Sequence, residues 1–104
     1  MSSFDDRENA FEAKFAHDEA LLFKATARRN KLLGLWAAAL LGKEGEAAEE
    51  YAKEVVRADF EEPGDDDVIR KVAGDLGDKA SDADIRAQLE ALMSEAKAQI
   101  ADEA

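Results

Sequence analysis

The fold is decided by the stretch Asn30-Lys31-Leu32-Leu33-Gly34-Leu35-Trp36-Ala37-Ala38-Ala39-Leu40-Leu41. Its apolar side chains cover most of the circumference of a helix, and a helix of this kind must be buried on several sides. We therefore predict that residues 30–41 form the central helix of a bundle. Trp36 has only apolar neighbours nearby and is expected in the core.

Before this stretch, the helical pattern extends back to Phe4, so we predict a first helical region from Phe4 to Leu41. One stripe along it advances by steps of seven and four residues, at Phe4, Phe11, Phe15, Leu22 and Thr26. The part before residue 18 is leaner in apolar residues, because its aromatic rings sit among charged side chains. We therefore divide the chain into an N-terminal arm, residues 1–17, and a bundle, residues 18–104.

Three more helices are predicted after Gly42. The first runs from Glu46 to Phe60 and ends before Pro63, which cannot continue a helix. A short helix follows Asp65-Asp66-Asp67, whose acids supply a cap and favourable charge at its start, and Gly77 ends it. The last helix begins at Ser81, which forms a capping box with Asp84, and is expected to fray over residues 101–104. The predicted fold class is all-α, a four-helix bundle.

Charge and composition exclude several classes of function. The chain has 104 residues, a formal net charge of −11 and no cysteine. The acidic balance argues against nucleic acid as a partner, and the missing thiols exclude thiol catalysis and cysteine-ligated zinc. The longest apolar run has seven residues, far fewer than the ~20 that span a bilayer, so we expect no direct membrane insertion. The protein is expected to be cytoplasmic or peripheral.

Few side chains are arranged for chemistry. His17 is the only histidine, and His17 and Asp18 do not face each other on a helix, so a surface or cap role is favoured. The three consecutive acids at 65–67 do not follow the alternating ligand pattern of a calcium loop, so no metal is expected. We find no nucleophile motif and no marked carboxylate pair, and predict that the protein is not an enzyme.

The positive charge is concentrated in one place. Residues 1–23 carry six acids and two bases, whereas residues 24–43 carry five bases and no acid. Arg28, Arg29 and Lys31 would suit the phosphates of a nucleotide or an acidic protein patch, but no glycine-rich phosphate loop accompanies them. The alternative is internal pairing with acids of the next helix, such as Glu49, Glu50 and Glu54. The sequence leaves these alternatives open.

The N-terminal block resembles a known family. The residues that carry this resemblance are Phe4-Asp5-Asp6-Arg7-Glu8, Phe11-Glu12-Ala13-Lys14-Phe15-Ala16-His17-Asp18-Glu19, Phe23-Lys24-Ala25 and Ala27-Arg28-Arg29-Asn30-Lys31-Leu32-Leu33-Gly34-Leu35-Trp36-Ala37-Ala38. They closely resemble the ζ subunit of alphaproteobacterial F-type ATP synthases. The similarity is dense over residues 4–42 and looser over the remainder, where it includes the Pro-Gly break at 63–64.

The resemblance implies a non-catalytic regulator: a four-helix bundle with a mobile, partly helical N-terminal arm. That arm would insert at a catalytic α/β interface of the F1 ATPase, near the γ subunit, and block rotation in the hydrolytic direction. The expected contact residues are Phe4, Asp5, Arg7, Glu8, Phe11, Lys14 and Phe15. The protein would be a monomer when free and peripheral to the inner membrane through the ATP synthase. The alternative is a small adenine-nucleotide-sensing module that binds ATP or ADP weakly through Arg28, Arg29 and Lys31; otherwise no cofactor is expected.

Overall fold

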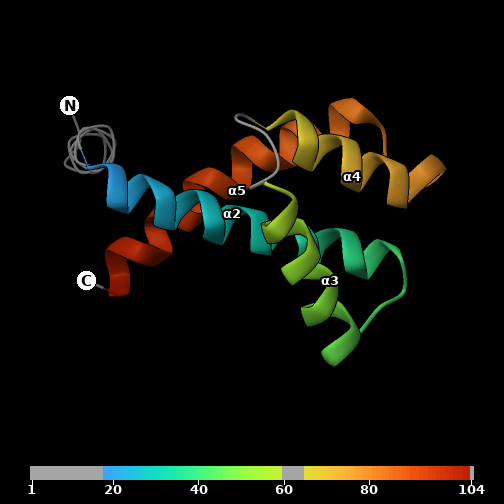
Figure 1. Ribbon diagram of the computed structural model, residues 1–104, viewed down its shortest axis with the longest axis horizontal. Helices are drawn as coiled ribbons and strands as arrows, with labels where there is room; N and C mark the ends of the chain where they lie inside the picture. Colours follow the sequence, from blue (N-terminus) through green and yellow to red (C-terminus); the bar gives the residue numbers. More distant parts are fainter. Residues whose placement is uncertain (1–17, 60–64, 104) are drawn as a thin grey trace, which may run out of the picture.

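A computed structural model describes residues 18–59 and 65–103 of the chain. Four α-helices and one short 3₁₀ helix lie within these residues (Figure 1). Their bounds are α2 Glu19–Leu40, α3 Glu46–Ala58, α4 Asp66–Leu76, η1 Gly77–Lys79 and α5 Asp82–Glu103. The described part of the chain contains no strand, and the all-α bundle predicted from the sequence is confirmed.

Helix α2 is the central element, as its apolar circumference predicts. It packs most extensively against α3 and then against α5, while α4 contacts all three of the other helices. After the turn at residues 41–45, α3 doubles back against α2 (Figure 1). Helix α2 therefore carries a neighbour on more than one side, and this accounts for its mixed rather than one-sided hydrophobicity.

The main core lies between α2, α3, α4 and the first half of α5. Its interior residues are all apolar apart from the Tyr51 hydroxyl, and comprise Leu33, Ala37, Ala38, Tyr51, Val55, Val68, Ile69, Val72, Leu76, Ile85 and Leu89. Trp36 packs against this cluster, as expected for a core residue, although its side chain stays partly exposed. Small side chains at 37 and 38 bring the helices close together, and the large indole is left at the edge.

A second, smaller cluster joins the start of α2 to the end of α5. Ala25 and Ile100 are buried in it, with Leu21 and Met93 packed against them. Helix α5 continues to Glu103, so the predicted fraying of residues 101–103 is wrong. The last turn is held because Glu103 accepts two hydrogen bonds from Arg28 of α2, at 2.8 and 3.1 Å.

Asp18 fixes the start of α2. Its backbone is extended (φ −123°, ψ 101°), and its side chain accepts a hydrogen bond of 3.1 Å from the Leu21 amide. This is the geometry of an N-cap residue. Helix α2 therefore begins at Glu19, and the part of the predicted helical region before Asp18 lies outside the described residues.

The other helix ends agree more closely with the sequence. Helix α3 begins at Glu46 as predicted and ends at Ala58, two residues earlier than expected. Gly77 follows α4 with a φ of +56°, a conformation that glycine adopts without a Cβ penalty. The capping box is confirmed: the Ser81 amide donates to Asp84 at 3.0 Å, and the Asp84 amide donates to the Ser81 hydroxyl at 3.1 Å.

Helices α2 and α3 touch through their backbones at Gly34. A Cβ placed on Gly34 would lie 2.6 Å from Ala52 Cα and 3.3 Å from a methyl group of Val55. Ala52 is itself almost fully buried. No side chain fits between these two helices without separating them.

We expect Gly34→Ala to lower the free energy of unfolding by about 1–3 kcal/mol, because the new methyl group overlaps backbone that cannot move independently. Gly74→Ala is the matched control, since a Cβ there meets nothing within 4 Å. It should stabilise α4 by up to ~1 kcal/mol through helix propensity alone. Urea denaturation measures both variants, and changes of the same sign would contradict this account of the α2–α3 contact.

Ser81→Ala should reduce stability by about 1 kcal/mol, because it leaves the Asp84 amide without its cap. Ser94→Ala, an exposed change within α5, should alter stability by no more than ~0.5 kcal/mol. Thermal melts followed by circular dichroism compare the two variants. Equal melting temperatures would show that the capping box contributes nothing to folding.

Candidate functional site

The predicted partner-binding residues lie outside the part of the chain that the structure describes. They are Phe4, Asp5, Arg7, Glu8, Phe11, Lys14 and Phe15. The same holds for His17. Their assignment stays a prediction. The described residues nevertheless show what lies beyond the arm, because Asp18 and α2 begin the bundle directly after it.

Arg28 ties the two ends of the bundle together. It forms an ion pair of 2.8 Å with Glu103 and donates a further hydrogen bond of 2.9 Å to Gln99, both on α5. The guanidinium group in turn lowers the pKa of the exposed Glu103 carboxyl through this hydrogen bond. Pairing of Arg28 with acids of α3 was one alternative from the sequence, and for this residue it is wrong.

Arg29 lies in a buried polar cluster where α3 ends and α4 begins. Its side chain is 6% exposed and pairs with Asp65 at 2.7 Å, and it also donates two hydrogen bonds to Asn30. Asp65 was expected to cap α4, but it makes no side-chain capping bond because its carboxylate accepts from Arg29 instead. Nearby, burial raises the pKa of the Asp59 carboxyl, and the charge of Arg29 opposes that rise.

Lys31 pairs with an acid of α3, as the internal-pairing alternative from the sequence predicts. Its Nζ lies 4.0 Å from a Glu49 carboxylate oxygen, and both side chains are about half exposed. The three bases predicted to hold a nucleotide therefore face three different acids: Glu103, Asp65 and Glu49. A phosphate group would compete with each of these carboxylates, and the nucleotide prediction remains untested.

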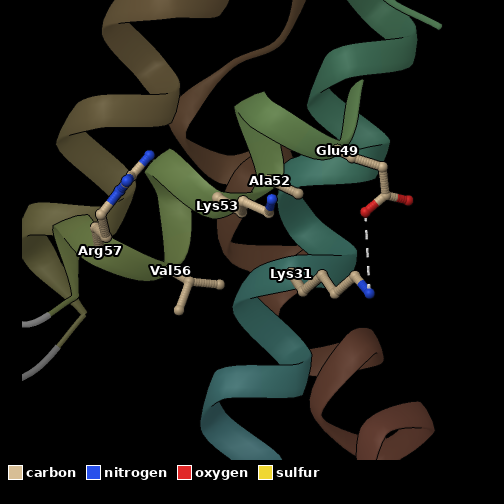
Figure 2. Close-up of a pocket in the computed structure, with 6 residues that line it drawn as sticks. All are labelled: Lys31, Glu49, Ala52, Lys53, Val56 and Arg57. Atoms are coloured by element: carbon tan, nitrogen blue, oxygen red, sulfur yellow. Dashed lines mark ion pairs between the residues drawn. The ribbon is translucent and has the colours of Figure 1, made fainter. Parts of the chain in front are cut away.

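A groove of about 350 Å³ lies beside the Lys31–Glu49 pair, between α2 and α3 (Figure 2). Its lining residues are Lys31 of α2 and five residues on one face of α3, namely Glu49, Ala52, Lys53, Val56 and Arg57. Ala52 and Val56 give it an apolar floor. Figure 2 shows Lys31 reaching from α2 toward Glu49, with Lys53 and Arg57 farther along α3. Three cations thus surround an apolar strip in a chain of net charge −11.

Sequence reasoning missed this groove, although part of its signal was present. Glu49, Lys53 and Arg57 recur every four residues, so they share one face of α3. Lys31 joins them only through the folding of α3 back on α2. That juxtaposition depends on the turn between the two helices and on their close contact at Gly34, neither of which has a charge signature.

Tyr51 anchors a second polar group on another face of α3. Its hydroxyl donates to Asp75 at 2.8 Å, and Lys71 lies 5.2 Å above its ring. Burial and the Asp75 hydrogen bond raise the pKa of the Tyr51 hydroxyl above its ordinary value. These contacts fasten α4 to α3 and have the character of a structural network rather than a site.

Residues 18–59 and 65–103 contain neither a cluster of metal-ligating side chains nor a helix able to cross a membrane. No three His, Cys, Asp or Glu side chains in this part of the chain are grouped so as to hold a metal ion. Among the described helices, none is both long enough and apolar enough to cross a membrane.

Comparison with known proteins places the chain in a family. The family model described as ATPase inhibitor subunit zeta matches residues 1–99. A solved structure titled "Solution NMR structure of the protein" is 61% identical with a TM-score of 0.74, covering 79% of this chain and 96% of that chain. No curated protein matches. Because the family match spans the N-terminal segment as well as the bundle, the chain belongs to the ATPase inhibitor subunit zeta family.

Proposed function

We propose that this protein inhibits ATP hydrolysis by the F1 sector of an F-type ATP synthase, without itself being a catalyst. The inhibitory element is the N-terminal arm, residues 1–17, which inserts at a catalytic α/β interface beside the γ subunit. The observation that carries the proposal is the family match, which begins at residue 1 and so includes the arm. The protein acts as a peripheral partner of the synthase on the cytoplasmic side of the inner membrane.

The organisation of the bundle supports separate roles for the two parts of the chain, with inhibition assigned to the arm. Both apolar clusters of the described residues are built from side chains of α2, α3, α4 and α5 with their connecting turns. Asp18 caps the start of α2 with its own side chain. The described residues thus contain an apolar core and a capped start of the bundle directly after the arm.

Binding of the arm to F1 needs more favourable free energy than the burial of its phenylalanine rings provides. Fixing one backbone residue costs about 1–2 kcal/mol, and burying a phenylalanine side chain returns roughly 1.5–3 kcal/mol. Phe4, Phe11 and Phe15 alone therefore cannot order seventeen fully flexible residues. Partial order in the free arm, together with ion pairs from Arg7, Lys14 and the neighbouring acids, supplies the difference in this proposal.

Deletion of residues 1–17 tests the assignment. The truncated protein should keep its helical circular dichroism and lose little thermal stability, because Asp18 caps α2 with its own side chain and the two apolar clusters draw on all four α-helices. It should no longer inhibit ATP hydrolysis by F1 from the organism of origin, whereas the full chain inhibits in a dose-dependent manner. Hydrolysis is measured on both latent and activated enzyme preparations.

A double variant, Phe11→Ala with Phe15→Ala, serves as the milder test in the full-length chain. It should raise the half-inhibitory concentration by more than tenfold, since each lost ring removes roughly 1.5–3 kcal/mol of burial. The proposal fails if the full chain leaves hydrolysis unchanged at saturating dose. It also fails if the truncated bundle inhibits as strongly as the full chain.

A further inference from the structure

The buried side-chain amide of Asn30 makes hydrogen bonds through its oxygen only. Asn30 is 1% exposed, and its side-chain oxygen accepts two hydrogen bonds from Arg29, at 3.1 and 2.9 Å. A guanidinium group has only donors, so the oxygen of the Asn30 amide must be the atom that faces Arg29. The nitrogen Nδ2 therefore points away from Arg29, and none of the described residues accepts a hydrogen bond from it. Buried donors in native proteins are nearly always paired, either with protein or with ordered water.

A small hollow lies beside Asn30, between α2 and the end of α3. Its lining residues are Phe23, Thr26, Ala27, Asn30, Val56 and Asp59. Its volume is about 20 Å³, and a cavity needs on the order of 10–15 Å³ to hold one water molecule. The hollow therefore has room for a single water beside the unpaired nitrogen.

Two oxygen groups on the lining can complete the hydrogen bonds of such a water. The Asp59 carboxylate, at the C-cap of α3, is an acceptor. The Thr26 hydroxyl gives its proton to the Leu22 carbonyl at 2.9 Å, so its lone pairs remain to accept. With Asn30 Nδ2 as the donor, the hollow offers about three partners, the usual number for a buried water.

Asp59 is close to the Asn30 amide without being directly bonded to it. Burial raises the pKa of the Asp59 carboxyl, and Arg29 and the Asn30 amide oppose this rise. Nδ2 nevertheless has no hydrogen-bond partner in the part of the chain that the structure describes. A donor and an acceptor that are near each other but not bonded are suited to a bridging water.

We propose that one ordered water molecule occupies this hollow, accepting a hydrogen bond from Asn30 Nδ2 and donating to the Asp59 carboxylate and the Thr26 hydroxyl. The bridge attaches the end of α3 to α2, just as the Arg29–Asp65 ion pair of 2.7 Å attaches the start of α4. Adjacent residues of α2 thus hold Asp59 and Asp65, on either side of the connection between α3 and α4. The site involves no residue of the arm, so the inference goes beyond the proposed function and does not depend on it.

A crystal structure of the full chain, at a resolution that shows ordered water, tests the occupant directly. We expect one water within about 3.2 Å of both Asn30 Nδ2 and an Asp59 carboxylate oxygen. An empty hollow overturns the proposal. A protein atom that accepts the Nδ2 hydrogen bond in place of water also overturns it.

Nuclear magnetic resonance tests the same site in solution. The Asn30 Nδ2 protons should show cross-peaks to water of opposite sign in NOESY and ROESY spectra, because a water held in the hollow tumbles with the protein. The side-chain amide of Gln99, which bonds to Glu95 at the surface, is the matched control and should show no such pair of peaks. Thr26→Val removes the lining hydroxyl whose exchanging proton would otherwise mimic bound water, and the Asn30 peaks should persist there. Their absence in either protein contradicts the proposal.

An exchange of side chains tests whether residues 30 and 59 share the water. Asn30→Asp keeps an oxygen for Arg29 but removes the donor to the water, so the melting temperature should fall by about 4 °C or more. Adding Asp59→Asn restores one donor and one acceptor at the net charge of the parent, and should recover at least half of the loss.

The control for this exchange adds Asp78→Asn to Asn30→Asp instead. It makes the same change in net charge at an exposed residue outside the hollow and should recover nothing. If the single variant does not fold, the comparison between the two double variants remains. Equal melting temperatures for the two double variants overturn the bridge.

Discussion

The structure depends on the close approach of α2 and α3 at Gly34 and Ala52. A backbone-to-backbone contact of this kind leaves no space for a side chain at residue 34, so the two helices are held at a distance that small residues set. Leu33, Ala37 and Val55 then interdigitate on one side of the contact. The groove lined by Lys31 and one face of α3 borders the same contact, since Ala52 belongs to both. The core and the groove are consequences of the same packing.

The basic residues of α2 divide between holding the bundle together and facing solvent. Arg28 and Arg29 pair with acids far away in the sequence, on α5 and at the start of α4. A guanidinium group as buried as that of Arg29 is stable only when its donors are satisfied, and Asn30 and Asp65 accept from it. Lys31 alone of the three borders the groove. Lys31, Lys53 and Arg57 give the groove between α2 and α3 a basic rim.

Much of the fold follows from local sequence signals. The Ser81 cap before α5, the stop of α4 at Gly77 and the central place of residues 30–41 are set by capping chemistry, glycine conformation and apolar periodicity, respectively. The start of α2 was not predictable from periodicity, because the stripe of apolar residues continues across Asp18, whose extended backbone marks the point where α2 begins. The partial exposure of Trp36 could not be inferred from its apolar sequence neighbours, because it depends on how the four helices pack.

The site was less accessible to sequence reasoning than the fold. The partners of Arg28 and Arg29 are 75 and 36 residues away in the chain, and such separations are set only by the tertiary packing. The groove likewise needs α3 to fold back on α2 before Lys31 and Lys53 face one opening. The contact residues of the arm were assigned through resemblance to a family, and the family is confirmed while the individual contacts remain predictions.

The extended N-cap at Asp18 separates the segment proposed to determine inhibition from the bundle that determines stability. Helical register does not pass through an extended residue, so an insertion before position 18 does not by itself rotate α2 against its neighbours. Potency against the enzyme and resistance to heat can then drift independently during evolution. Chimeras that join the first seventeen residues of one homologue to the remainder of another at this junction should fold like the recipient and act like the donor.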